Sequence, residues 1–470
     1  MPAWEPVADI AEGVRSGRLK ATDLVRQSLS AISENSKYDA IISTLEERAM
    51  QRAEQIDNQP KGRLAGVPFI AKDNFLVFGG KTTAASNILR PFEAPYQSTA
   101  IERLEAEGAI CVAKANLDAF AHGSSTENSD WFTTKHPNDE TRVPGGSSGG
   151  SAASVALDIA PFALGTDTGG SIRLPASFCG VVGYKPTYGL VSRSGVVAMA
   201  SSTDVIGPLT KRVEDAALVL DVMSGRDELD STTIERDDNG YNGPAADFNG
   251  KRIGVIKEYF AEGIDPQVEK VVRQAIDKLT SNGAQVEEIS LPSLPLALAV
   301  YYIVCPAEVS SNLGRYDGQR FGHSAQDAKN LDESYELSRE QGFGAEAKRR
   351  IMIGTHVLSS GYYDAYYKKA QTVRTKIINE FAQAFNNFDL LAGPVAPMTA
   401  FKIGERTGDP LQMYLTDIMT VAANMSGNPS ISVPAGEVDG LPVGLQLIGK
   451  MSGDRELLAA AKKFEEINKQ

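Results

Sequence analysis

Two segments, Gly145-Gly-Ser-Ser-Gly-Gly-Ser151 and Gly165-Thr-Asp-Thr-Gly-Gly-Ser-Ile-Arg173, decide how this sequence is interpreted. Each places serine hydroxyls in glycine-rich backbone, where main-chain N–H groups can approach a ligand because glycine has no Cβ. Such N–H groups can hold the negatively charged oxygen that develops in acyl transfer. The chain has only four histidines, so we expect one of these serines to be activated by a base other than imidazole.

The composition is that of a soluble globular protein. Of 470 residues, 42% are hydrophobic and 23% are charged, and the mean hydropathy is −0.21. The net charge of −13 argues against this chain holding a nucleic acid alone, so another chain should bind it. No apolar run reaches the roughly 18 residues that span a bilayer, and residues 1–6 do not resemble a secretory signal. We expect a cytoplasmic protein that does not associate with a membrane.

The three cysteines, Cys111, Cys179 and Cys305, are far apart in the sequence. They form no CxxC pair and no Cys/His spacing typical of a metal site or a disulfide framework. We predict buried free thiols and no metal site in this chain.

Strand-like apolar runs alternate with helical periodicity, which is the pattern of an α/β fold. A predicted amphipathic helix over 99–107 joins the first two strands. A second helix begins at the cap residue Asp265, has Pro266 in its first turn and ends at Gly283, and it joins the last two strands. The predicted strands are 67–71, 109–113, 252–256 and 284–289.

Two polar stretches interrupt this pattern. Residues 224–250 are rich in Asp and Gly and predict a linker or a long surface loop. Residues 318–348 are rich in charge and have little strand character, which predicts an exposed helical excursion. Neither stretch establishes a domain boundary.

A phosphate-binding loop is one interpretation of the glycine-rich segments, because such turns before helices can hold phosphates. The nearest match to the Walker pattern is Gly80-Lys81-Thr82, and Phe75 stands where the pattern requires its first glycine. No Gly-x-Gly-x-x-Gly follows a predicted strand, so the fingerprint of a dinucleotide-binding fold is also missing. We therefore discard both nucleotide-binding interpretations.

A nucleophile elbow is the second interpretation, because Gly145-Gly-Ser147-Ser-Gly149 fits Gly-x-Ser-x-Gly. An elbow follows a central strand directly, whereas residues 136–144 are polar and carry a proline near each end. The base would have to be His323 or His356, and neither has an obvious acidic partner.

The third interpretation makes Ser171 the nucleophile. A short strand predicted at 159–164 leads into the turn 168–171, whose successive N–H groups can form an oxyanion-binding nest beside the serine hydroxyl. Ser147 would relay the proton to a base that is neutral near pH 7. Lys72 can be that base, because it follows the apolar run 67–71 and burial lowers the pKa of a lysine. Its position alone would also suit an ordinary surface lysine.

Taken together, Ala-Lys72-Asp-Asn, Gly-Gly-Ser147-Ser-Gly-Gly-Ser and Thr-Gly-Gly-Ser171-Ile-Arg resemble the amidase signature family. The resemblance implies an α/β amidase signature fold with a large central mixed β-sheet covered by helices on both faces. It implies one domain over 1–470 with a signature core at about 66–212. It also implies a Ser-cis-Ser-Lys triad in which Ser171 is the nucleophile, Ser147 the bridging serine and Lys72 the base. By the same resemblance, the oxyanion hole is formed by Thr168, Gly169, Gly170 and Ser171.

Further segments resemble one branch of that family, the glutaminase subunits of tRNA-dependent amidotransferases. The branch implies hydrolysis of glutamine to glutamate and ammonia. A partner would use the ammonia in the ATP-dependent conversion of Glu-tRNA(Gln) to Gln-tRNA(Gln), with Asp-tRNA(Asn) as a second candidate. The implied assembly is a heterotrimer in which a B subunit binds tRNA, ATP and Mg²⁺ and a small C subunit braces the complex, and this chain itself holds no cofactor. The segments are 123–129, 349–354, 360–366 and 440–449.

The same branch implies that Arg350 and Asp417 bind the α-carboxylate and α-amine of glutamine, with Tyr301 as a further pocket residue. Arginine presents a planar fork to a carboxylate and aspartate complements an ammonium, so this pair would select a free amino acid. Without the motif, each residue would suggest only a surface salt bridge. A stand-alone amidase acting on another small amide, and a scaffold with an inactive triad, are the alternative functions.

One position departs from the family pattern. Where the family usually reads Met-Gly-Ser-Ser, this chain has His122-Gly-Ser-Ser125. The substitution lies beside the predicted active-site loop. It would either alter substrate contacts and the local pH response or be a tolerated loop variation.

Overall fold

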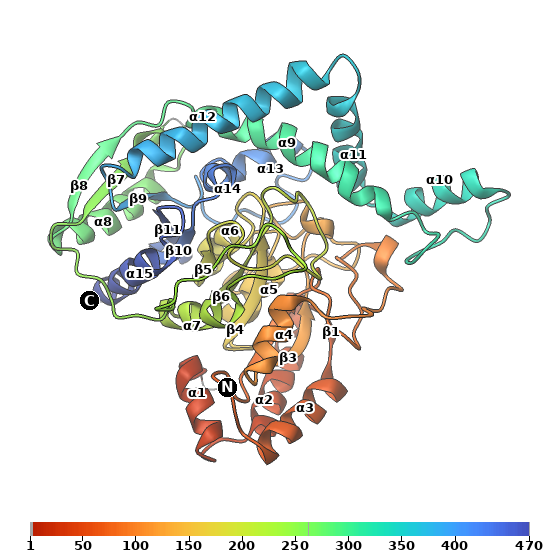
Figure 1. The fold of residues 1–470 in the computed structure, drawn as a ribbon, viewed down its shortest axis with the longest axis horizontal. Helices are drawn as coiled ribbons and strands as arrows, with labels where there is room; N and C mark the ends of the chain where they lie inside the picture. The colour runs from red at the N-terminus through yellow and green to blue at the C-terminus, as the bar shows by residue number, and fades with distance from the viewer. Residues whose placement is uncertain (1–2, 262, 470) are drawn as a thin grey trace.

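The strands form one mixed sheet. The computed structural model describes residues 3–261 and 263–469, and within these ranges an eleven-stranded sheet has the order β1-β3-β2-β4-β6-β5-β10-β11-β9-β7-β8 (Figure 1). Of the domain expected over 1–470, residues 1–2, 262 and 470 lie outside the described residues. The strands are β1 Ile41–Thr44, β2 Pro68–Lys72, β3 Ile110–Ala115, β4 Phe162–Asp167, β5 Val182–Lys185, β6 Val205–Thr210, β7 Arg252–Ile256, β8 Gln285–Ile289, β9 Leu390–Pro394, β10 Ser430–Val438 and β11 Leu441–Gly449.

Parallel pairing occurs in two parts of the sheet. β2 runs parallel to both β3 and β4, and β7 runs parallel to both β8 and β9. The two predicted strand–helix–strand units are confirmed as β2-α4-β3 and β7-α8-β8. In the second unit, the Asp265 side chain accepts a hydrogen bond from the N–H of Gln267, so it caps α8 as its sequence predicts.

The strand predicted at 159–164 is displaced toward the C-terminus. The observed strand, β4, begins at Phe162 and continues to Asp167 because its last residues pair with β6, with Asp167 opposite Val205. Residues 165–167 are Gly, Thr and Asp, which are not typical of a buried strand, so the sequence pattern did not predict this extension. As a result, the strand delivers Thr166 and Asp167 directly to the turn that carries Ser171.

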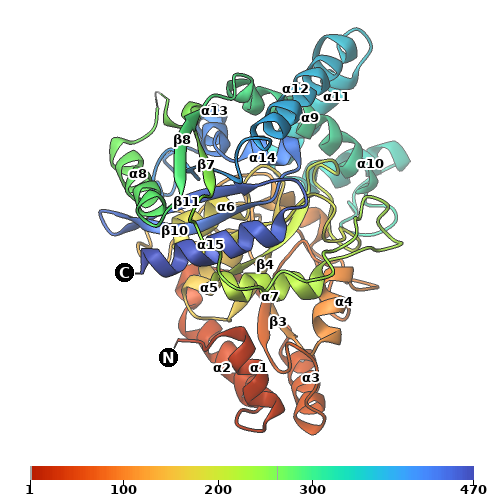
Figure 2. The same cartoon turned by 60° about the vertical axis from the view of Figure 1, so that its left-hand side comes forward.

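Helices cover both faces of the sheet, as the family resemblance implies. On β11, a side chain at Gly444 would meet Ser177 of α6, whereas one at Gly449 would meet Leu457 of α15. Because side chains alternate along a strand, α6 and α15 lie on opposite faces (Figure 2). The helices are α1 Val7–Arg15, α2 Ala21–Glu34, α3 Glu46–Asn58, α4 Thr99–Ala106, α5 Gly149–Ala156, α6 Arg173–Cys179, α7 Val213–Met223, α8 Pro266–Ser281, α9 Ala297–Asn312, α10 Leu331–Gly342, α11 Ala345–Leu358, α12 Lys369–Ala384, α13 Pro410–Tyr414, α14 Val421–Ser426 and α15 Asp454–Asn468.

Helix α9 is more apolar than the sequence inspection indicated. The helical stretch Leu294–Arg315 has the length and composition that could cross a membrane. Its most apolar 18 residues have a mean hydropathy of 1.4, and half of them are buried inside the fold. Glu308 interrupts its apolar residues, so no uninterrupted run stands out in the sequence. Contacts of α9 with α11, α12 and α14 account for the burial, as for a core helix of a soluble protein.

The polar stretches take the forms that the sequence predicts. Residues 224–250 contain no helix or strand and connect α7 to β7 as a long loop. Within 318–348, α10 projects from the body of the molecule, as Figure 1 shows, and α11 begins at Ala345. The three cysteines are free and buried, as predicted.

Candidate active site

The topology of the sheet brings two of the sequence motifs together. Strands β2 and β4 are adjacent and parallel, so their carboxyl ends lie at the same edge of the sheet. Lys72 is the last residue of β2, and Asp167 is the last residue of β4. The segment that precedes α5 carries Ser147 to the same edge.

Lys72 is wholly buried, so the surface-lysine interpretation is wrong. Its Nζ lies 2.8 Å from the Ser147 Oγ, 2.9 Å from the Ser148 Oγ and 2.9 Å from the Thr166 Oγ1. Burial lowers the pKa of Lys72 to about 7, although nearby carboxylates, Asp118 first among them, act in the opposite direction. The side chain can therefore exist as a neutral amine close to neutral pH.

Ser147 lies two residues before the start of α5 and contacts Lys72 from there. The Gly146–Ser147 peptide bond is cis, which agrees with the cis-serine that the family resemblance implies. No strand leads directly into this serine: between the end of β3 at Ala115 and the start of α5 at Gly149 the described chain has no β pairing beyond the isolated bridges His136–Asp139 and Arg142–Lys402, so the elbow interpretation lacks its strand. Within the same described residues, the Ser171 hydroxyl forms no hydrogen bond to another residue. Ser171 as a whole is 8% exposed.

The turn 168–171 has the glycine-dependent backbone that the sequence predicts, with one difference. The N–H of Gly170 donates to Asp167 Oδ1 at 2.9 Å, so it is not free to bind an oxyanion. In the described part of the chain, the N–H groups of Thr168, Gly169 and Ser171 have no partner. The predicted four-residue oxyanion hole therefore lacks Gly170 as a donor in this arrangement.

Two neighbours press closely against this turn. Gly170 has a φ of +140°, and a Cβ there would lie 2.2 Å from the Thr420 Oγ1. A Cβ on Gly169 would lie 2.8 Å from the Tyr301 ring. Only glycine fits at either position, and Tyr301 is therefore placed directly against the nest.

A buried ion pair between Asp167 and Arg173 holds the two ends of the turn together. Asp167 and Arg173 are both fully buried, with 3.0 Å between Asp167 Oδ1 and Arg173 Nη2. The pKa of Asp167 falls to about 2 because the Arg173 charge and hydrogen bonds outweigh the effect of burial. Asn424 of α14 donates a further hydrogen bond to the same carboxylate. The aspartate is thus committed to structure and is not available as an acid or a base.

Asp417 is buried, and Thr420 links it to the turn 168–171. Its carboxylate accepts hydrogen bonds from the Ser124 hydroxyl at 2.9 Å and from the Tyr302 hydroxyl at 3.3 Å. Its main-chain oxygen accepts from Thr420, whose hydroxyl also donates to the carbonyl of Gly169. Burial raises the pKa of Asp417 to about 7, against the effect of the Ser124 hydrogen bond and the Arg350 charge.

Arg350 projects from α11 into the same region and is also buried. Its Nε pairs with Glu346 Oε1 at 2.8 Å, and its guanidinium lies 5.3 Å from the Tyr302 ring centroid and 5.5 Å from that of Tyr414. Surface salt bridges are therefore the wrong interpretation of Arg350 and Asp417, since both side chains are inside the protein. The pairing with Glu346 was not predicted from the sequence.

The partners Ser148, Thr166, Ser124 and Tyr302 were also missed. Ser148 and Thr166 lie inside the two glycine-rich segments. The sequence does not indicate that their hydroxyls point toward Lys72. Ser124 and Tyr302 approach Asp417 only through tertiary structure.

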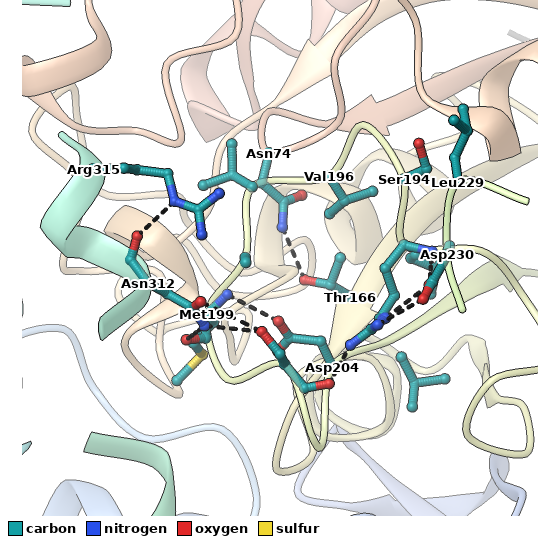
Figure 3. Close-up of a pocket in the computed structure, with 16 residues that line it drawn as sticks. Asn74, Thr166, Ser194, Val196, Met199, Asp204, Leu229, Asp230, Asn312 and Arg315 are labelled. Atoms are coloured by element: carbon teal, nitrogen blue, oxygen red, sulfur yellow. Dashed lines mark hydrogen bonds and ion pairs between the residues drawn. The ribbon is translucent and has the colours of Figure 1, made fainter. Parts of the chain in front are cut away.

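A cavity of about 230 Å³ adjoins Lys72 on the side of Thr166. Figure 3 shows Asn74 donating to Thr166 within its wall, which Asp204 and Met199 also line. A space of this size, lined in part by polar groups, is large enough for several water molecules. Tyr301, Arg350 and Asp417 are not part of its lining, so it is distinct from the region between those residues.

The alternative bases lie apart from the serines. His323 is hydrogen-bonded to Gln341, and the ring of His356 packs against Tyr362. Among the residues that the structure describes, no group of three His, Cys, Asp or Glu side chains could hold a metal ion.

The amidase family profile matches residues 23–458, nearly the whole length of the chain. This chain belongs to the amidase family. The lysine and the two glycine-rich serine segments all lie within the matched residues.

Two of the similar proteins are named for one activity. The A subunit of the glutamyl-tRNA(Gln) amidotransferase of Thermoanaerobacter pseudethanolicus is 51% identical over 98% of this chain and 96% of its own length. The solved structure of the protein of that name from Thermotoga maritima is 41% identical, with a TM-score of 0.80 over 95% of this chain and 91% of its own. A bacterial aryl acylamidase of the amidase signature family is 25% identical, with a TM-score of 0.87 over 99% and 96% of the two chains.

Proposed function

We propose that this amidase is the glutamine-hydrolysing A subunit of a glutamyl-tRNA(Gln) amidotransferase. Relatives at about 50% identity over nearly the full chain carry that name, whereas the aryl acylamidase shares 25%. The observation that carries the catalytic part is the contact of the buried Lys72 amine with Ser147 Oγ at 2.8 Å, at the sheet edge where Ser171 also lies.

In the proposed reaction, neutral Lys72 takes the proton of Ser147 while Ser147 takes that of Ser171. The Ser171 oxygen attacks the side-chain amide carbon of glutamine, and the carbonyl oxygen becomes an oxyanion held by the N–H groups of Gly169 and Ser171. The proton returns through Ser147 to the amide nitrogen, the C–N bond breaks, and ammonia leaves. Water then attacks the acyl-enzyme by the same relay and releases glutamate.

The residues beside the nest suit a free amino acid as substrate. Asp417 offers a carboxylate to the α-ammonium, Arg350 offers a guanidinium to the α-carboxylate, and Tyr301 lies against Gly169. The buried setting strengthens both charge interactions, because water does not screen them there. An apolar amide would offer neither residue a group of opposite charge.

We propose further that the ammonia serves a partner. The net charge of −13 and the absence of a nucleotide-binding motif in the sequence support a division of labour in the cytoplasm. A B subunit would bind tRNA, ATP and Mg²⁺ and amidate Glu-tRNA(Gln), with Asp-tRNA(Asn) as a second candidate. A small C subunit would complete a heterotrimer.

The test is ammonia release from glutamine by the chain alone and with the reconstituted partner subunits, followed by amidation of Glu-tRNA(Gln). The proposal predicts one glutamate for each ammonia and no release by Ser171→Ala. Equal release by wild type and Ser171→Ala would contradict the mechanism.

A second comparison separates a glutaminase from a stand-alone amidase. Arg350→Ala should abolish glutamine binding, while Arg349→Ala serves as a matched control because Arg349 also pairs with Glu346 but is half-exposed. Efficient turnover of unrelated amides, with Arg350→Ala fully active, would favour the stand-alone enzyme.

A further inference from the structure

His122 is a buried polar residue that the proposed mechanism leaves without a role. It is 1% exposed, and neither ring nitrogen has a hydrogen-bond partner among the residues that the structure describes. His136 provides a contrast, since it is also buried but both of its nitrogens are bonded, Nε2 with the Phe178 carbonyl at 2.7 Å and Nδ1 with the N–H of Asn138 at 3.1 Å.

Two unpartnered nitrogens on one buried ring need a physical explanation. A buried donor or acceptor without a partner destabilises the folded protein, and most such groups in folded proteins are satisfied. Burial and the nearby Arg350 charge lower the pKa of His122, so its ring is neutral. A neutral imidazole presents one N–H donor and one nitrogen acceptor.

The backbone around His122 is firmly held. The Asp118 carboxylate accepts from the N–H groups of Thr126 and Asn128, and the Asn128 side chain donates to the carbonyl of His122 at 2.7 Å. Two residues after His122, Ser124 donates to Asp417. The ring is therefore positioned on the loop that holds the proposed ammonium-binding carboxylate.

Arg350, whose charge acts on this ring, has only part of its donor set available. Its Nε is bonded to Glu346, and its Nη1 lies 3.9 Å from the Cys305 Sγ. Within the described chain, its Nη2 has no partner. Nη2 carries two N–H groups and Nη1 keeps one that Cys305 does not use, whereas a carboxylate has about four acceptor positions on its two oxygens. A further donor beside Arg350 would therefore complete its hydrogen bonding in a buried site.

We propose that His122 is a substrate-binding residue, donating its ring N–H to the α-carboxylate of the amino acid beside Arg350. The inference rests on the proposed function, in which free glutamine is the substrate. Hydrogen bonds to a charged group are stronger than neutral ones, so this contact supports specificity for an acid over a neutral analogue. The methionine usual at this position in the family could not make it.

The experiment compares wild type with His122→Met on two substrates, using the chain with its reconstituted partner subunits. Glutamine carries the α-carboxylate, and 4-aminobutanamide is the same molecule without it. We expect His122→Met to raise the KM for glutamine about tenfold with kcat nearly unchanged. On 4-aminobutanamide, the ratio of kcat/KM between wild type and variant should fall to about one.

His122→Gln keeps an N–H donor and should recover glutamine binding to within about threefold of wild type. His136→Met is the matched control for removing a buried histidine, and it should lower thermal stability without changing the ratio between the two substrates. The same ratio on both substrates, or an unchanged KM for glutamine, would overturn the role of His122. If wild type hydrolyses no glutamine, it is the proposed function that fails.

A second measurement requires no substitution of His122. In the Ser171→Ala protein with ¹⁵N-labelled histidine, saturating glutamine should shift the His122 ring N–H resonance, assigned by its loss in His122→Met. 4-Aminobutanamide at saturation should leave that resonance in place. Equal shifts with both compounds, or none with bound glutamine, would contradict the proposed contact.

Discussion

Two lysines on neighbouring strands, Lys72 at the end of β2 and Lys114 in β3, are both wholly inaccessible to solvent. Lys114 has a carboxylate partner, Asp73, at 2.8 Å, and it also donates to the carbonyl of Phe75. Lys72 instead meets the hydroxyls of Ser147, Ser148 and Thr166.

The difference separates a structural lysine from a chemical one. A carboxylate compensates an ammonium charge inside a protein, whereas hydroxyls solvate the charge only in part. Burial without an adjacent counter-ion is what lowers the pKa of Lys72 to about 7. The same side chain, one strand away, is therefore suited to take a proton in one place and to join two strands in the other.

The largest expected effect is on catalysis, in Lys72→Met. Loss of the base should reduce kcat/KM for glutamine by roughly 10⁴-fold, the upper range for general-base catalysis. The unfolded lysine binds a proton more tightly than the folded one, so between about pH 7 and its unfolded value the folded wild type carries a cost that falls as pH rises. Methionine carries no such cost, and the variant should melt no lower than wild type at pH 7. Steady-state kinetics and thermal unfolding check both statements.

Lys114→Met should act on stability. Removal of one member of a buried pair leaves the Asp73 carboxylate uncompensated, and we expect the free energy of unfolding to fall by about 3–5 kcal/mol. The double variant Lys114→Met/Asp73→Leu should recover part of that loss. Denaturant unfolding measures all three, and a loss below about 1 kcal/mol in Lys114→Met would remove the contrast with Lys72.

The pH profile should reveal the unpaired lysine and Asp417 together. Lys72 acts when it has lost its proton, and Asp417 binds an ammonium when it is charged, so both become competent as pH rises through about 7. The plot of log kcat/KM for glutamine against pH should have a slope approaching two below that value and should be flat above it, until the α-ammonium of glutamine itself loses its proton at alkaline pH. In Asp417→Asn the slope should be close to one at a lower activity. A profile that falls as the pH rises through 7 would contradict the assignment.

Ser148→Ala should give the smallest effect. It removes one of the hydroxyls that accept from Lys72, which disfavours the protonated amine. We expect the midpoint of the profile to move to lower pH, with less than a threefold change in kcat/KM on the plateau. A shift to higher pH would show that Ser148 does not stabilise the ammonium form.

Much of this arrangement could be predicted from the sequence. The segments around Lys72, Ser147 and Ser171 predicted the nucleophile, the bridge and the base, and the structure brings the lysine and the first serine into contact. Strand β4 was predicted too early because its last residues are held by pairing with β6 and not by apolar periodicity.

Interactions across long sequence separations could not be predicted. Ser124 reaches Asp417 across 293 residues and Tyr302 reaches it across 115, and nothing in the local sequence indicates either contact. Glu346 lies only four residues before Arg350 in α11, and Gly170 only three after Asp167, so these two contacts were within reach of sequence inspection. The unpartnered ring of His122 is likewise visible only after folding, although the departure from the family's methionine had marked the position.

The most direct test of the central claim is the pKa of Lys72 itself. In protein with ¹³C-labelled lysine side chains, the Cε resonance absent from Lys72→Met reports its protonation by NMR. A titration midpoint near pH 7 is the result that the account predicts. A Cε resonance showing that the Lys72 side chain stays protonated up to about pH 10, as for an ordinary lysine, would contradict it.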